Sequence, residues 1–226
     1  MIERFSITAE LGEMAEAFRV EKIVRGYTNK FNVAPIQTVS IVMNNRLGQR
    51  VMDESRWGLF PFWAKDSINA DVTTLESKPF FERMLRRQRC VVPCSGFFGW
   101  QPVEQERDPR AMHIVVNGQP LFGMAGFYDI WTNARGEEQK AFTVVTAAAS
   151  GTMSRWQQQV PIILDEEGME DWMNPDLTEF RRLRKHLEPL ESYQMRAYPV
   201  TNAIKSEEYE SEDCVREIYP ADFALY

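Results

Sequence analysis

Thiol and imidazole side chains, which could act as nucleophiles, bases or metal ligands, are few in this chain. They are three cysteines and two histidines: Cys90, Cys94, Cys214, His113 and His186. The cysteines have neither the even count of a disulfide scaffold nor the doubled CxxC motif of a structural zinc site, and two histidines cannot build a multi-histidine metal centre. We therefore expect reduced thiols, no metal and no other cofactor.

Cys94 is the thiol nearest to a motif that could carry chemistry. It follows Pro93 and precedes the run Gly96-Phe97-Phe98, with no lysine or histidine beside it. A reactive thiol needs a neighbouring positive charge or base to lower its pKa. We therefore expect Cys94 to be buried and inert.

Two basic clusters could bind phosphate groups. They are Arg83, Arg86, Arg87 and Arg89, and Arg181, Arg182, Arg184 and Lys185. An apolar stripe accompanies the second cluster and favours a solvated helix face, whereas the first leaves a solvated face and a phosphate groove both open. The net charge is −7, and residues 205–217 carry six acids against two bases. Any affinity for nucleic acid must therefore be local to one patch.

The run from Trp57 to Trp63 combines four large aromatic residues with Gly58 and Pro61, which are typical of a loop. Unpaired bases stack readily on exposed aromatic rings, but most aromatic side chains pack in a core. Both interpretations of this run stay open.

The elements that must position these residues follow from hydrophobic periodicity. Residues 9–20 form an amphipathic helix with Thr8 as its cap, and further helices are predicted near 79–88, 165–174 and 176–187. Seven short runs predict strands: Val39–Met43, Cys90–Val92, Phe97–Trp100, His113–Val116, Leu121–Tyr128, Phe142–Thr146 and Ile162–Leu164. Strands without regular helical crossovers predict an α+β fold, with a curled, largely antiparallel, barrel-like sheet and flanking helices.

The 226 residues, 44% of them hydrophobic, suffice for a sizeable core, and no linker or repeat divides them. We expect one domain over residues 1–226, present as a monomer. No apolar run approaches the roughly 18 residues of a membrane span, and the acidic N-terminal region lacks the features of a secretion signal. These features predict a cytoplasmic protein that does not contact membranes.

Five motifs occur here in the order and spacing of the SRAP family of SOS-response-associated, abasic-site-processing proteins. They are Phe31–Pro35, Trp57–Trp63, Ile68–Ala70, Arg89–Pro93 continuing through Gly96–Trp100, and Val145–Ala148. The chain resembles that family from Arg4 to about Val200. The resemblance implies a compact α+β domain on a barrel-like sheet, whose groove binds single-stranded DNA at abasic sites.

The family's chemistry, as the resemblance implies it, uses an N-terminal cysteine exposed by removal of the initiator methionine. Its amine forms a Schiff base with the abasic aldehyde, and its thiolate closes a thiazolidine ring. This chain begins Met1-Ile2-Glu3-Arg4-Phe5. Ile2 has no thiol, and its bulk disfavours removal of Met1, so the resemblance implies that the family's crosslink cannot form.

Other positions of the family's site depart in the same direction. Gly99 stands where the family has a glutamate that assists proton transfer, and Gln157 where it has a histidine. Neither side chain can exchange a proton near neutral pH. Asp71 and Gln159 stand where the family has arginines for phosphate. The resemblance thus implies lost catalysis and weakened DNA binding.

Five matching positions are retained: Asn69 in the catalytic set, and Arg4, Asn32, Trp63 and Thr146 in the DNA-binding set. Each has an alternative structural role. Arg4 could be an ordinary surface cation, the two asparagines could hydrogen-bond to local backbone, and Thr146 could simply belong to its strand.

Three hypotheses about function remain, and they leave enzymatic activity open. The leading one is a diverged SRAP-like protein that has lost crosslinking and keeps weak affinity for single-stranded DNA or another ligand. The second is an active DNA-processing enzyme in which Lys78 or the Met1 α-amine forms a Schiff base without a thiol. The third is a protein-interaction module that uses the groove or the acidic C-terminal residues.

Overall fold

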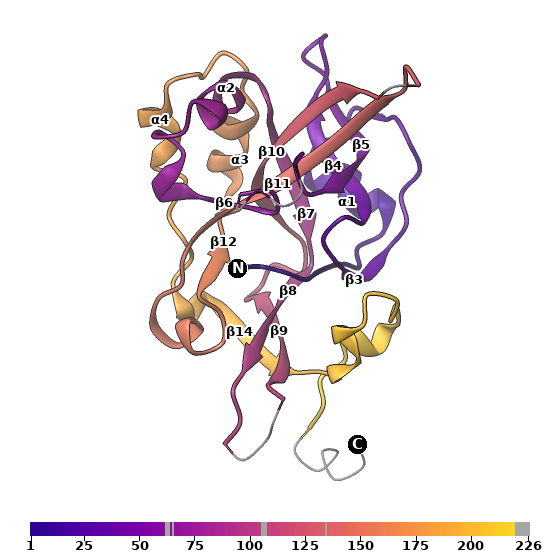
Figure 1. The fold of residues 1–226 in the computed structure, drawn as a ribbon, viewed down its shortest axis with the longest axis vertical. Coiled ribbons are helices and arrows are strands. Elements are labelled where there is room, and N and C mark those ends of the chain that lie inside the picture. Colours follow the sequence, from indigo (N-terminus) through magenta and orange to yellow (C-terminus); the bar gives the residue numbers. More distant parts are fainter. Residues whose placement is uncertain (62–63, 65, 105–107, 134, 220–226) are drawn as a thin grey trace.

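A computed structural model describes residues 1–61, 64, 66–104, 108–133 and 135–219, and it has the predicted α+β architecture (Figure 1). The helices of this described part are α1 (Leu11–Ala17), α2 (Pro79–Arg87), α3 (Glu166–Met173) and α4 (Phe180–Arg184). None of them is long and apolar enough to cross a membrane.

A barrel-like sheet forms one half of the molecule. Its strands are β4 (Thr38–Asn44), β5 (Arg50–Trp57), β7 (Arg89–Cys94), β10 (Phe122–Thr132) and β11 (Glu138–Ala148). Neighbours in the order β11-β10-β7-β4-β5 pair antiparallel, and a parallel pairing of β5 with β11 through Phe142 and Trp57 closes the circuit. Closure removes free edges from the central strands.

Shorter strands extend this sheet at its margins. They are β2 (Lys22–Ile23), β6 (Asn69–Asp71), β12 (Gln159–Pro161) and β13 (Ile163–Leu164). β6 runs parallel to β11, and β12 pairs with the same strand antiparallel. Because β6 and β12 both pair with β11, Asn69, Asp71 and Gln159 lie near each other although they are far apart in sequence.

The second sheet has the order β14-β9-β8-β1-β3 and is antiparallel throughout. Its strands are β1 (Phe5–Ile7), β3 (Lys30–Val33), β8 (Gly96–Gln101), β9 (Arg110–Val116) and β14 (Met195–Pro199). The N-terminal strand thus lies inside this sheet, between β8 and β3, and the first residues of the chain lie near the centre of the view in Figure 1.

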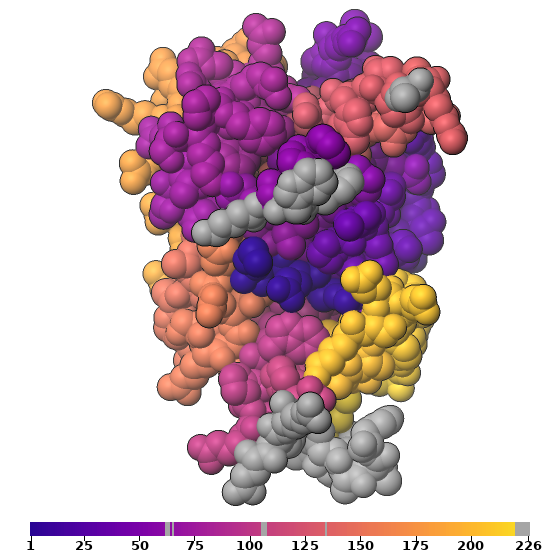
Figure 2. Space-filling model, in the orientation of Figure 1, coloured from indigo at the N-terminus to yellow at the C-terminus, as the bar shows by residue number. Residues whose placement is uncertain are grey.

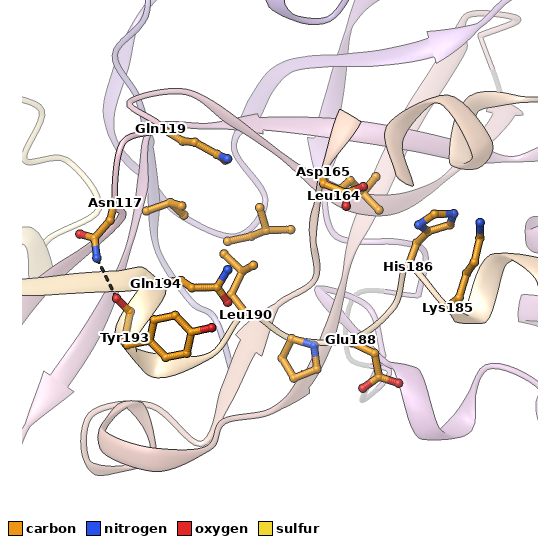
Figure 3. Close-up of a pocket in the computed structure, with 13 residues that line it drawn as sticks. Asn117, Gln119, Leu164, Asp165, Lys185, His186, Glu188, Leu190, Tyr193 and Gln194 are labelled. Atoms are coloured by element: carbon orange, nitrogen blue, oxygen red, sulfur yellow. Dashed lines mark hydrogen bonds between the residues drawn. The ribbon is translucent and has the colours of Figure 1, made fainter. Parts of the chain in front are cut away.

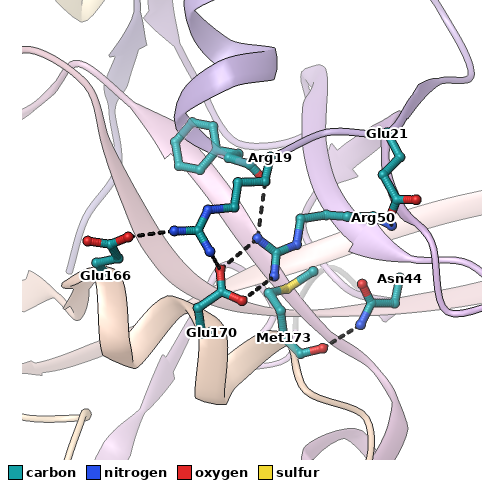
Figure 4. Close-up of polar contacts among 8 residues, drawn as sticks. Arg19, Glu21, Asn44, Arg50, Glu166, Glu170 and Met173 are labelled. Atoms are coloured by element: carbon teal, nitrogen blue, oxygen red, sulfur yellow. Dashed lines mark hydrogen bonds and ion pairs between the residues drawn. The ribbon is translucent and has the colours of Figure 1, made fainter.

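The packing of α3 shows how helices are fixed to the barrel. Trp172 is fully buried, its ring centroid lies 5.4 Å from that of Phe127, and its indole nitrogen donates to the Cys90 carbonyl at 2.9 Å. On the outside, Arg50 of β5 makes a bidentate ion pair with Glu170, at 3.0 and 3.2 Å, which Arg19 joins at 3.0 Å (Figure 4). Bidentate arginine pairs fix both distance and orientation.

Two predicted helices differ from those observed. The first begins at Leu11 with Glu10 as its N-cap, not Thr8, because Glu10 and Glu13 satisfy each other's backbone N–H groups in a capping box. It ends at Ala17, and Arg19 adopts a positive φ of 51°. The fourth helix covers only Phe180–Arg184 of the predicted 176–187.

All seven predicted strands exist, but several observed strands were missed: β1, β2, β3, β5, β6, β12 and β14. The strand β5 carries Asp53, Glu54 and Arg56 in its middle, so its pattern resembles a polar surface segment. Asp53 is nevertheless 3% exposed, because it pairs with Lys140 at 2.8 Å. Pairing of buried charges across strands is not visible as periodicity.

Candidate functional site

The N-terminus lies on a face where three distant segments meet. Figure 2 shows the indigo N-terminal residues between the orange segment that contains Gln157, the yellow C-terminal segment and the purple residues of the first half of the chain. A cavity of about 310 Å³ opens here and is lined by Met1, Glu3, Trp100, Pro102, Ser154, Arg155, Trp156, Gln157 and Gln158. These contacts make this face the candidate site.

Asn69 holds the start of the chain. Its side-chain nitrogen donates to the Ile2 carbonyl at 2.7 Å, and Asn69 is 4% exposed. Its Oδ1 atom is buried with no hydrogen-bond partner among the described residues, so one acceptor beside the start of the chain is unpaired. Ile2 itself is fully buried in the core, whereas Met1 is 48% exposed. The Ile2 side chain therefore points into the core, whereas its neighbours Met1 and Glu3 line the cavity.

Gly99 and Gln157 lie on the same side of this site. The Gln157 amide nitrogen donates to the Phe98 carbonyl at 3.3 Å, and the Trp156 carbonyl accepts from Trp100 at 2.9 Å. A Cβ atom on Gly99 would lie 3.1 Å from both the Trp156 carbonyl oxygen and Ile114 Cδ1, which is tighter than ordinary contact. These two positions therefore contribute packing and a neutral hydrogen bond, and neither supplies a proton-transfer group.

Asp71 is held by neutral donors at the edge of the barrel. One carboxylate oxygen accepts from the Gln159 amide at 2.9 Å, and the other accepts from the Thr73 backbone at 2.9 Å as the cap of the short 3-10 helix Val72–Thr74. Thr146 is fully buried in β11, and its hydroxyl lies 3.4 Å from the Gln159 side-chain oxygen. Asp71 and Gln159 thus form a fixed, negatively charged unit.

Arg4 and Asn32 are engaged with the C-terminal segment. Arg4 is 8% exposed; it donates to Asn32 Oδ1 at 3.3 Å and to the Lys205 carbonyl at 3.0 Å. Burial lowers the pKa of the Arg4 guanidinium. The Asn32 amide donates to three backbone carbonyls, those of Ile204, Ser206 and Tyr209. Arg4 is therefore not an ordinary surface cation, and a DNA-binding role for either residue stays a prediction.

The aromatic run and the first basic cluster divide between core and surface. Trp57 is fully buried and stacks on Phe142, whereas Phe60 is 62% exposed; Phe62 and Trp63 lie outside the described residues. Arg89 donates to three backbone carbonyls, and burial lowers its pKa to about 10. Arg89 is therefore structural, and only the three arginines on α2 lie at the surface.

The remaining groups to be considered for chemistry are the three thiols and Arg155. Cys90, Cys94 and Cys214 are all buried and free, as expected for Cys94, and burial raises the pKa of each thiol. Arg155 is the basic side chain among the described lining residues of the N-terminal cavity, which Met1 with its α-amino group also lines. No motif contains Arg155, so sequence reasoning had no signal for it.

One group of side chains has ligand atoms close enough to hold a metal. Atoms of Glu167, Asp171 and His186 lie within 4.8 Å of one another. The Lys185 ammonium already lies 2.7 Å from Glu167 and 3.5 Å from Asp171, so an internal cation balances the two carboxylates. Lys185 and His186 border a separate cavity of about 570 Å³, with Asn117 and Tyr193 at its other end (Figure 3).

The sequence of this chain matches a family model and is similar to several named proteins. The family model described as SOS response associated peptidase (SRAP) matches residues 1–207. The chain is 30% identical over 226 residues to the abasic site processing protein YoqW of Bacillus subtilis, covering 95% of this chain and 99% of that one. It is 31% identical over 219 residues to YobE of the same organism, also named an abasic site processing protein, covering 92% and 98%.

Solved structures show the same fold. A crystal structure of a protein from Bacteroides thetaiotaomicron superposes with a TM-score of 0.80 at 24% identity, over 96% of this chain and 99% of that chain. A phage-related protein from Bordetella bronchiseptica gives a TM-score of 0.72 at 20% identity, over 88% and 93%. These likenesses concern the fold alone.

Proposed function

The chain belongs to the SOS response-associated peptidase (SRAP) family, and on that premise we propose that it is a member that binds single-stranded DNA weakly and does not crosslink to abasic sites. The named relatives are abasic site processing proteins, which supports DNA as the ligand class. The site of this chain differs from the family pattern in its reactive groups, which supports the loss of the covalent step.

The observation that carries the proposal is the state of the second residue. Ile2 is fully buried, and Asn69 fixes its carbonyl at 2.7 Å. Formation of a thiazolidine requires an amine and a thiolate on one N-terminal residue, and Ile2 supplies neither while Met1 remains attached. The buried cysteines cannot replace the thiol, because burial raises the pKa of each one.

At positions 99 and 157 the site also has no side chain that can transfer a proton. A Schiff base forms and breaks through protonation of a carbinolamine hydroxyl, which a nearby acid assists. Gly99 and Gln157 supply a backbone and an amide at the corresponding positions. An amide can orient a hydroxyl group but cannot donate a proton to it near neutral pH.

Two amines were alternatives for a thiol-independent reaction. The Lys78 ammonium is paired with Asp66 and borders a different, mainly apolar cavity beside Phe60 and Phe80. The Met1 α-amine belongs to a residue that lines the N-terminal cavity. Without a thiolate to close a ring, an imine at Met1 would remain open to hydrolysis, so only a reductant would trap it.

Weak binding follows from the charges around the cavity. The lining contains one basic side chain, Arg155, and one acidic side chain, Glu3. Asp71 adds a further negative charge at the edge of the barrel. Each phosphate contact to a single strand contributes about −0.7 to the slope of log K against log salt. One to three contacts therefore give a shallow slope.

The proposal is tested by fluorescence anisotropy with a labelled 20-nucleotide single strand that contains one abasic site. The aldehydic site is compared with its reduced, unreactive analogue, and an aldehyde-reactive probe verifies the starting DNA. We expect weak binding of equal affinity to both strands. A slow rise in signal confined to the aldehydic strand, or tight binding at physiological salt, would contradict the proposal.

A further inference from the structure

We propose that residues 205–217, the acidic C-terminal segment, act as an intramolecular competitor that keeps polyanions from the Arg4 side of the groove. The inference rests on the proposed function, because it names the feature that makes DNA binding weak. Its evidence is separate, because it comes from contacts of the segment and not from the reactive positions.

The segment is fixed in place by buried contacts. The Asn32 amide donates to the carbonyls of Ser206 and Tyr209 at 2.9 Å and of Ile204 at 3.2 Å. Ile204 and Cys214 are fully buried in a small apolar cluster. The acidic side chains are therefore carried on a backbone that is held against β3 and β8, and do not belong to a loose tail.

A carboxylate of this segment already faces the buried guanidinium. Glu207 Oε1 lies 3.9 Å from Arg4 Nη2, and the same nitrogen donates to the Lys205 carbonyl at 3.0 Å. The Glu207 side chain is 65% exposed and that of Arg4 is 10% exposed. A phosphate that approached Arg4 would have to displace or face this carboxylate.

Three further acids of the segment, Glu208, Glu210 and Glu212, are exposed, whereas Asp213 and Glu217 pair with Arg216 and Arg196. Of the six acids in the segment, Glu210 also accepts from the Phe31 backbone. Figure 2 shows the yellow segment directly beside the indigo N-terminal residues, on the side away from the orange segment. The family match ends at residue 207, so five of these six acids lie beyond it.

The magnitude of the effect follows from screened Coulomb interactions. Charges within a Debye length of about 10 Å at 0.1 M salt still interact, and those farther away do not. Removing three acids of this segment, including the one that faces Arg4, should therefore tighten single-strand binding by about fivefold at low salt, and less at high salt. Removing three distant acids should change affinity by less than about twofold, although the net charge changes equally.

The experiment compares two variants with the same change in net charge. The segment variant carries Glu207→Gln, Glu208→Gln and Glu212→Gln. The control variant carries Glu16→Gln, Glu179→Gln and Glu188→Gln, which are exposed residues of other elements. Both are titrated with a labelled 20-nucleotide single strand at 50 and 200 mM salt, and circular dichroism and thermal unfolding check that each is folded.

We expect about fivefold tighter binding for the segment variant alone, with a larger gain at 50 mM than at 200 mM salt. Equal affinities of the two variants would overturn the inference while leaving the proposed weak binding intact. Tight binding by the wild-type protein would instead contradict the proposed function. An equal gain in both variants would assign the effect to net charge and also overturn the inference.

Discussion

At the scale of single residues, the amide of Asn32 shows how a motif position can serve the fold. Its three carbonyl partners are 172 to 177 positions away in sequence, and its oxygen accepts from Arg4. The motif identified Asn32 as a position of interest, but no local pattern could reveal partners at that separation. The same holds for Asn69, whose partner is the carbonyl of Ile2, 67 positions away.

Replacement of Asn32 by alanine tests this structural role. Asn32→Ala removes one buried and two partly buried hydrogen bonds to the C-terminal segment together with the contact to Arg4, so we expect a loss of about 2–4 kcal/mol in the free energy of unfolding. Urea denaturation measures it. Asn29→Ala is the matched control, because the Asn29 amide lies 3.3 Å from the Thr8 carbonyl near the surface, and it should cost less than about 1 kcal/mol. Equal costs would show that Asn32 does not anchor the segment.

At the scale of elements, the second sheet is joined through one buried histidine. His113 of β9 is 3% exposed; its Nε2 atom lies 3.0 Å from the Ser6 hydroxyl of β1 and its Nδ1 atom 2.8 Å from the Tyr198 hydroxyl of β14. The Tyr198 hydroxyl donates to the Val215 carbonyl at 3.1 Å, and the Ser6 hydroxyl lies 3.2 Å from the Gly96 carbonyl, so both hydroxyls that face the imidazole also have a backbone acceptor. The His113 imidazole thus links β9 to β1 and β14 through hydrogen bonds with their hydroxyl groups.

This arrangement predicts a specific pH dependence of stability. Burial lowers the pKa of His113 from 6.5 to about 3, so below pH 6.5 the unfolded chain binds a proton that the folded chain excludes. The stabilising contribution is complete above pH 6.5 and is lost as pH falls toward 3. Between pH 7.5 and 5 we expect the wild type to lose about 2 kcal/mol more than His113→Gln, measured by urea denaturation. Identical pH profiles would contradict this assignment.

The same scale shows which elements periodicity predicts. Apolar runs such as β7 and β10 are buried on both faces and were predicted, whereas β1 and β6 contain only three residues each. Such short strands have no periodicity of their own, and neighbouring strands define them. The single domain predicted for residues 1–226 stays a prediction.

At the scale of the whole molecule, the net charge is −7 in a chain whose named relatives are abasic site processing proteins and for which we propose DNA binding. Phosphate affinity must then come from local cations. The guanidinium groups of Arg4 and Arg89, however, already donate hydrogen bonds to backbone carbonyls. Asp71 adds a negative charge at the edge of the barrel, fixed by Gln159 and Thr73. The sequence revealed the altered charges, but not that the retained arginines are buried.

Reversing the charge at position 71 should raise DNA affinity. Asp71→Arg removes a repulsion and adds a cation, so we expect tighter binding of a single strand and a slope of log K against log salt that is steeper by about 0.7. Asp176→Arg makes the same charge change at an exposed position between α3 and α4, and should leave the slope unchanged. An unchanged slope in Asp71→Arg would show that this edge of the barrel does not contact DNA.

The most direct test of the proposed loss of crosslinking is intact-mass spectrometry of the wild-type protein after incubation with abasic single-stranded DNA, with and without borohydride. Without reductant we expect the mass of the unmodified chain, because Ile2, Gly99 and Gln157 supply no nucleophile and no proton-transfer group. With borohydride, any trapped imine maps by peptide analysis to its amine. A DNA adduct that persists through denaturation without reductant would contradict the account.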